Sequence, residues 1–163
     1  MAFAVPLLVS LAACVTMPER VGFSARQIEV LEGAGFRPVG SGYELGISNR
    51  VLFGFDSAGI VPETATMLAG LSKQLLDAEI YGAGIVGHTD AVGEDEYNVR
   101  LSRSRAEAVR DALIAGGMDL TRMRVDGLGE SDPIESNDSE TGRTQNRRVV
   151  IIVTPADALP VGR

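Results

Sequence analysis

Apolar residues recur with two different periods along the chain, and these periods predict two long helices and four strands. Spacing by three or four positions is typical of a helix packed on one face. One helix is predicted to start at Pro62, where the missing N–H costs nothing. A second is predicted over residues 101–115 and ends at Gly116-Gly117. The helix residues expected to face inward are Leu68, Leu71, Leu75, Ala108, Val109, Ala112 and Leu113.

Strand patterns cover residues 51–55, 80–87, 123–127 and 149–153. The last is a continuous apolar run, which is typical of a strand buried on both faces in the middle of a sheet. The order β-α-β-α-β-β predicts an α+β fold, a two-layer sandwich in which a mixed sheet carries its helices on one face. Residues 128–146 are predicted to form a long polar loop, and such a loop inside a compact domain is usually functional.

A short helix and a hairpin are predicted ahead of this domain. Ser24 can cap a helix over residues 25–32, and glycines follow it. Residues 36–39 and 43–45 are predicted to pair across a glycine-rich turn.

The N-terminus has the features of an export signal. Residues 2–13 form an uncharged apolar run, too short to span a bilayer and of the length of a signal-peptide core. The sequence Leu11-Ala12-Ala13-Cys14 resembles a bacterial lipobox, which implies cleavage before Cys14 and attachment of lipid to it. The absence of Lys or Arg from the first residues is the one departure from the signal-peptide pattern. The alternative is a buried helix with an ordinary core cysteine, and we favour the lipobox. Valine rather than aspartate after Cys14 favours the outer membrane.

Length and charge bound the remaining possibilities. A chain of 163 residues suits one domain with an extension, and a net charge of −7 argues against nucleic acid as a partner. We divide it into a signal peptide (1–13), the lipidated cysteine and tether (14–22), a helix-and-hairpin extension (23–49), the main domain (50–155) and a C-terminal tail (156–163).

No residue pattern predicts an enzyme, a metal site or a cofactor. The GxGxxG at residues 82–87 precedes or lies within a strand and is followed by a loop, whereas a dinucleotide site needs a helix there. His88 is the only histidine, so multi-histidine metal sites are excluded, and hydrogen bonds that order the strand end are its expected role. Glu94 and Glu96 lie in a charged run that is expected to be solvated.

Asp90 and Arg105 stand at opposite ends of a loop-to-helix unit and leave two interpretations open. The first is an ordinary surface ion pair, worth about 0–1 kcal/mol. The second is a receptor for a ligand that carries both an ammonium and a carboxylate, because a guanidinium offers two parallel N–H donors to a carboxylate. The charges alone favour the first.

An ordered set of motifs resembles the OmpA-like C-terminal domain, which also occurs in the peptidoglycan-associated lipoprotein. The set consists of Gly87-His88-Thr89-Asp90, Gly93, Tyr97-Asn98, Leu101-Ser102, Arg105-Ala106, Gly127, Gly129-Glu130, Pro133, Asn137, Gly142-Arg143 and Asn146-Arg147-Arg148-Val149. It covers residues 51–154, about two thirds of the chain. The resemblance implies the same β-α-β-α-β-β fold and non-covalent binding of peptidoglycan through the meso-diaminopimelate of its stem peptide.

The resemblance also implies roles for single residues. Asp90 and Arg105 match the ligand-contacting pair, Phe55 and Asp56 match positions that line the same pocket, and Asn98 with Leu101 is expected to shape its wall. The roles of Arg143, Arg147 and Arg148 stay open, between ligand contact and ordering of the loop. The predicted partners are peptidoglycan and, through the lipid on Cys14, the outer-membrane bilayer, so that the protein faces the periplasm.

Residues in the extension resemble the YfiB-type branch of OmpA-like lipoproteins. They are Gln27-Ile28, Gly35-Phe36, Tyr43-Glu44-Leu45-Gly46 and Val51-Leu52-Phe53. That resemblance implies an alternative function as a periplasmic signalling regulator, which sequesters a repressor of a membrane diguanylate cyclase.

Overall fold

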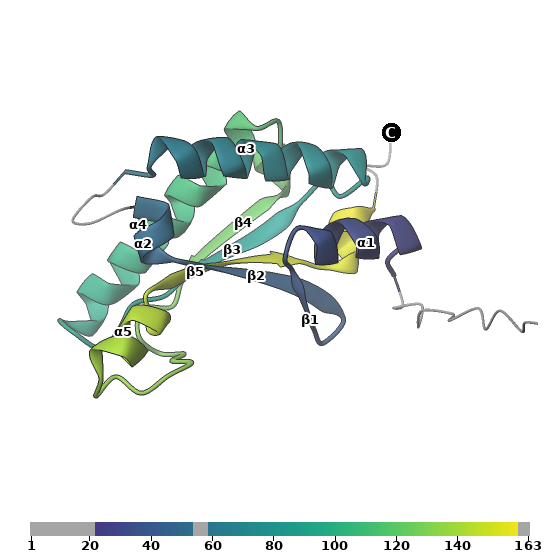
Figure 1. The fold of residues 1–163 in the computed structure, drawn as a ribbon. Coiled ribbons are helices and arrows are strands. Elements are labelled where there is room, and N and C mark those ends of the chain that lie inside the picture. Colours follow the sequence, from purple (N-terminus) through teal and green to yellow (C-terminus); the bar gives the residue numbers. More distant parts are fainter. Residues whose placement is uncertain (1–21, 54–58, 160–163) are drawn as a thin grey trace, which may run out of the picture.

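The computed structural model describes residues 22–53 and 59–159 of the chain. One five-stranded mixed sheet runs in the order β1-β2-β5-β3-β4, with β3 and β4 parallel and the other pairs antiparallel (Figure 1). The strands are β1 (Arg37–Val39), β2 (Gly42–Ser48), β3 (Ala83–Gly87), β4 (Met123–Gly127) and β5 (Arg148–Val153). The continuous apolar strand β5 lies in the middle of the sheet, as predicted.

The longest helices lie on one face of this sheet, and the predicted α+β class is confirmed (Figure 1). Helix α4 packs on β3 and β4, and α3 packs on α4. The helices are α1 (Ala25–Gly33), α2 (Asn49–Phe53), α3 (Pro62–Asp77), α4 (Asp95–Ala115) and α5 (Glu140–Asn146). Single 3₁₀ turns are formed by Leu120–Arg122 and Pro155–Ala158.

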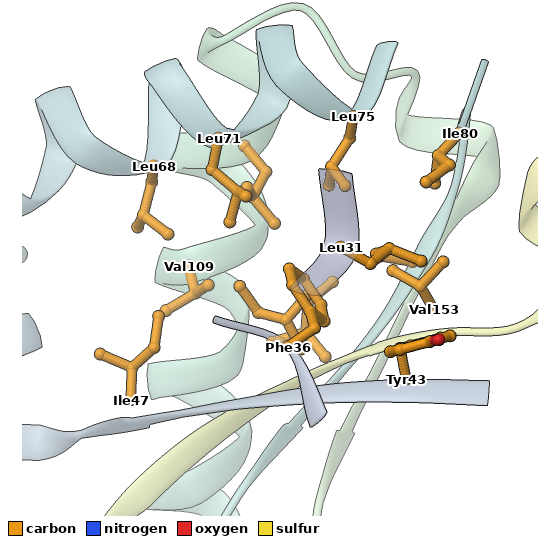
Figure 2. Close-up of a cluster of buried hydrophobic side chains, with 14 of the residues drawn as sticks. Leu31, Phe36, Tyr43, Ile47, Leu68, Leu71, Leu75, Ile80, Val109 and Val153 are labelled. Carbon is orange, nitrogen blue, oxygen red and sulfur yellow. The ribbon is translucent and has the colours of Figure 1, made fainter. Parts of the chain in front are cut away.

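The core fills the space between the helices and the sheet. Figure 2 shows Leu68, Leu71 and Leu75 of α3 pointing toward side chains of the sheet, as their spacing predicts. Helix α1 adds Leu31, which is fully buried, and Ser24 caps that helix by accepting a hydrogen bond from the Gln27 N–H. The extension therefore shares one hydrophobic core with the main domain.

The strand predicted at residues 51–55 is wrong for residues 51–53, and residues 54 and 55 lie outside the described residues. Residues 49–53 form the short helix α2, and the sheet position is taken by β2, which pairs with β5 from Tyr43↔Val153 to Ser48↔Arg148. A five-residue apolar stretch fits one helical turn as well as a strand, and the turn buries the consecutive Leu52 and Phe53 while Val51 is exposed. The predicted order of elements holds when β2 is counted as its first strand.

Three further boundaries differ from the prediction. Strand β3 begins at Ala83 instead of residue 80. Helix α4 begins at Asp95 instead of residue 101, because the polar first turn carries acidic residues that suit a helix N-terminus. Residues 128–146 are not a loop throughout, since α5 forms their last part and Ser139 caps it through the Gly142 N–H. Of the residues predicted to face inward, Ala108 and Ala112 are only half-buried.

The signal peptide, Cys14 and nearly all of the tether lie outside the described residues, as do Phe55 and Asp56. Within residues 22–53 and 59–159, no helix combines the length and apolar character needed to cross a bilayer. The C-terminal tail starts with the Pro155–Ala158 turn, where buried Asp157 accepts two hydrogen bonds from Arg124 at 2.6 and 2.9 Å.

Candidate functional site

A cleft of about 340 Å³ opens where the ends of β3 and β5 meet the first half of α4. Strand β3 is antiparallel to β5, so the chain leaves β3 beside the start of β5, and the His88 N–H donates to the Arg148 carbonyl at that point. The cleft is lined by Thr89, Asp90 and Val92 from the loop after β3, Tyr97, Asn98, Leu101 and Arg105 from α4, and Glu140, Arg143 and Arg147 from α5 and the residue after it.

Asp90 is held in the wall of the cleft with little exposure. Only 7% of the residue is accessible, and its Oδ1 accepts a hydrogen bond from the Val92 N–H at 3.2 Å. The Nδ2 of buried Asn98 donates to the Asp90 and Val92 carbonyls and, at 2.6 Å, to Glu130. Asn98 thus fixes the loop that carries Asp90, and it also lines the cleft.

Arg105 is the guanidinium without a counterion in this cleft. No carboxylate of the described residues forms an ion pair with it, and its Cζ lies 5.8 Å from the centre of the Phe53 ring. Burial lowers the pKa of the Arg105 guanidinium, Tyr97 and Asp90 oppose that shift, and Arg147 adds to it. Since a guanidinium stays protonated in proteins, the cleft holds an uncompensated positive charge that suits an anion.

Arg147 is the ion-pair partner of Asp90. One guanidinium nitrogen of Arg147 contacts Asp90 Oδ2, and the other contacts Glu140 Oε1 and Thr144 Oγ1, both at 2.7 Å. Burial disfavours the charged form, but the hydrogen bonds to Glu140 and Asp90 outweigh it and raise the pKa of Arg147. An ion pair between Asp90 and Arg105, the simpler interpretation of their charges, is therefore absent from the described residues.

The remaining charges in the cleft belong to α5. Glu140 pairs with Arg143 at 2.9 Å, and hydrogen bonds from Arg147 and Arg143 lower the pKa of Glu140 to about 2. Arg143 also donates to the Asn137 carbonyl at 2.8 Å, so it orders the preceding loop. Arg148 does not line this cleft: it is buried and pairs with Asp132 at 3.2 Å.

Four of the predicted ligand-binding residues thus line one cleft: Asp90, Asn98, Leu101 and Arg105. They come together because helix α4 places Leu101 and Arg105 one turn apart, facing the loop after β3. Ligand contact by these residues stays a prediction.

A family model supplies the identification. The model of the OmpA family matches residues 52–147, more than half of the chain. The chain belongs to the OmpA family. The outer-membrane lipoprotein YfiB of Pseudomonas aeruginosa is 40% identical to this OmpA-family chain over 151 residues, which are 93% of the chain and 89% of that relative. The peptidoglycan-associated lipoprotein of Brucella melitensis is 33% identical over 126 residues, 76% of the chain and 75% of the relative.

Solved structures agree with this assignment. The peptidoglycan-associated lipoprotein of Burkholderia pseudomallei superposes with a TM-score of 0.56 and 33% identity, over 63% of this chain and 86% of that one. A MotB-like protein of Desulfovibrio vulgaris superposes with a TM-score of 0.66, over 79% of this chain and 95% of that one, and at 23% identity it bears on the fold alone. The predicted resemblance to OmpA-like domains and to their YfiB-type branch is confirmed.

In the described part of this OmpA-family domain, the GxGxxG does not have the geometry of a dinucleotide site. Gly84 and Gly87 lie within β3, and a loop, not a helix, follows them. Burial and Arg148 lower the pKa of His88 to about 4, so its imidazole is neutral at neutral pH. Residues 22–53 and 59–159 also contain no group of three or more His, Cys, Asp or Glu side chains that could hold a metal ion.

The role predicted for the His88 side chain is wrong in one respect. Its buried Nδ1 has no hydrogen-bond partner and lies 3.9 Å from Asp132 Oδ2, so the strand end is ordered through the backbone N–H instead. His88 does not line the cleft around Asp90 and Arg105, and the neighbours of its imidazole include Asp132 and Arg148.

The sequence motifs did not reveal the contact between Asp90 and Arg147 or any role for Glu140. One signal was present in the sequence: Glu140, Arg143 or Thr144, and Arg147 recur at three- and four-residue spacing, which places them on one face of a helix. That pattern predicts ion pairs within α5. It does not predict that the same face points at Asp90, because this depends on how β5 pairs with β3.

Proposed function

We propose that this protein is an outer-membrane lipoprotein that binds peptidoglycan non-covalently and so connects the envelope to the wall. The observation that carries the proposal is the unpaired, half-buried guanidinium of Arg105 in the same cleft as the carboxylate of Asp90. A ligand with a carboxylate and an ammonium has a partner for each charge there. The names of the OmpA-family relatives, lipoproteins of the outer membrane or associated with peptidoglycan, support the same function.

The proposed ligand group is the free end of meso-diaminopimelate in the stem peptide. Its ammonium binds Asp90 and its carboxylate binds Arg105, while Leu101 supplies apolar wall for the methylene chain. Phe55 and Asp56 complete the pocket in this proposal. Two charge-assisted contacts of about 1.5–3 kcal/mol each give modest affinity after association entropy is subtracted.

Lipid on Cys14 would make modest affinity sufficient. Two or more acyl chains anchor a protein stably in a bilayer, which a single chain does not. An anchored domain then meets the repeating wall polymer at a high effective concentration, so many weak sites hold the wall together with the membrane. In this proposal the domain faces the periplasm.

Retention of the full chain on purified sacculi tests this function. Walls with diaminopimelate should retain the protein, and free meso-diaminopimelate should release it. Walls whose stem peptide carries lysine at the same position are the matched control, because lysine keeps the ammonium but lacks the second carboxylate. Equal retention on both kinds of wall would show that the ligand is some other part of peptidoglycan.

The YfiB-type signalling role is a second candidate, because the similarity to YfiB covers 93% of the chain and so includes residues ahead of the family match. In this proposal the extension binds a periplasmic repressor of a diguanylate cyclase. Deleting residues 23–48 cannot test it, since that removes the sheet strand β2. Val39→Glu is the better variant, because Val39 is exposed on the edge strand β1. Co-purification of a periplasmic partner should be lost while wall retention stays, and an unchanged partner would exclude this surface.

A further inference from the structure

The Asp90 carboxylate is paired with Arg147 within the protein itself. Arg147 contacts its Oδ2, and the same guanidinium also binds Glu140 and Thr144, both at 2.7 Å. The pair is partly shielded from water, with side-chain exposures of 25% for Arg147 and 11% for Asp90. An ammonium that binds Asp90 must therefore displace or share this contact.

Arg147 has a second carboxylate partner in the cleft besides Asp90. Glu140 is exposed to 67% at its side chain and belongs to the cleft lining, so it stays paired with Arg147 when the Asp90 contact is given up. The backbone of Arg147 is fixed independently of its side chain, since its N–H donates to the Arg143 carbonyl and its carbonyl accepts from the Asn49 N–H. The guanidinium can thus change partners without a change of fold.

We propose that Arg147 determines specificity by competing with the ligand ammonium for Asp90 and, once displaced, by pairing with the ligand carboxylate together with Arg105. This inference rests on the proposed function and concerns how the same cleft selects its ligand. A ligand with an ammonium alone must break the Arg147–Asp90 pair and supplies no carboxylate to the displaced guanidinium. A ligand with both groups supplies a new carboxylate to the displaced guanidinium, so only the zwitterion is bound well.

Three small molecules that share the same five-carbon chain separate these contributions. They are meso-diaminopimelate, which has both groups at each end, 1,5-diaminopentane, which has only the ammonium groups, and pimelate, which has only the carboxylates. Titration of the purified full chain should give the order diaminopimelate, pimelate, 1,5-diaminopentane, from tightest to weakest.

Arg147→Met should reverse part of this order. We expect the affinity for 1,5-diaminopentane to rise about tenfold, because Asp90 loses its competitor, and the affinity for pimelate to fall by a similar factor, as one charge-assisted contact predicts. Arg143→Met is the matched control: it removes the same charge from the same cleft, but Arg143 contacts Glu140 and the Asn137 carbonyl and not Asp90. If both variants raise diamine binding equally, only the net charge matters and the proposal is overturned.

Glu140→Gln provides an independent readout. With Glu140 gone, Arg147 keeps Asp90 as its only carboxylate, so diaminopimelate binding should weaken several-fold. In the Arg147→Met background the same Glu140→Gln change should have a smaller effect, because only the pairing of Glu140 with Arg143 is then left to lose. An equal effect in both backgrounds would mean that Glu140 does not act through Arg147. Wild-type protein that binds neither diaminopimelate nor sacculi would overturn the proposed function itself, whereas normal wild-type binding with unaltered selectivity in Arg147→Met would overturn this inference alone.

Discussion

Retention on diaminopimelate-containing sacculi is expected to fall by about ten- to a hundredfold when Arg105 is replaced by methionine. Loss of a charge-assisted contact of about 1.5–3 kcal/mol accounts for that factor. Methionine keeps an apolar side chain next to the Phe53 ring, over which the guanidinium of Arg105 now lies, so the thermal unfolding midpoint should change little. Quantitative pull-down with a series of sacculus concentrations measures the effect.

Asp90→Asn should lower retention on sacculi by a similar factor, because it weakens the contact with the ligand ammonium. The amide oxygen can still accept the hydrogen bond from the Val92 N–H, so the loop keeps its conformation, but the negative charge that attracts an ammonium is lost. Arg100→Met is the control for both variants. Arg100 lies on the same helix as Arg105, pairs with the exposed Glu96 and is not among the described residues that line the cleft. Normal retention of Arg105→Met and Asp90→Asn would place the wall-binding site elsewhere.

The elements that the sequence predicts well are the long, strongly periodic ones. Pro62 at its start and leucines at regular spacing are enough to predict helix α3. An unbroken apolar run is enough to predict β5. The prediction for residues 51–53 failed because so short a stretch shows no hydrophobic period that separates a helix from a strand. Its conformation is decided by β2, which occupies the place beside β5 and pairs with residues a hundred or more positions away.

The same distinction explains the site. Asp90 and Arg105 stand in one loop-to-helix unit, so a local motif is enough to propose them together. Arg147 is 57 residues from Asp90, and their contact follows from the antiparallel register that sets Gly87 opposite Val149. Register between distant strands depends on the packing of both faces of the sheet, which one stretch of sequence does not contain.

Gly87→Ala is expected to have the largest effect on stability, at about 3 kcal/mol or more. A Cβ added to Gly87 would lie 1.9 Å from the Ser102 carbonyl oxygen, a backbone atom of α4. A Cβ added to Gly127 would likewise lie 2.4 Å from the backbone nitrogen of Arg103, the next residue of that helix. Backbone cannot swing aside as a flexible side chain can, so the helix must move away from the sheet. Urea denaturation followed by circular dichroism measures the loss.

Gly46→Ala is the matched control, because Gly46 lies in β2 of the same sheet and an added Cβ there meets nothing within 4 Å. We expect its unfolding free energy to stay within about 1 kcal/mol of the wild type. A similar loss in both variants would mean that the cost comes from alanine in a strand and not from the approach of α4.

The close approach at Gly87 also bears on ligand binding. The glycine ends the strand that leads to Asp90, and it touches α4 three residues before Arg105, so it sets the position of one charge relative to the other. Gly87→Ala should therefore reduce sacculus retention even under conditions where the variant remains folded, whereas Gly46→Ala should retain it. Folded Gly87→Ala protein with full retention would mean that the cleft tolerates a displaced α4, and that the ligand can adjust to the spacing of its two partners.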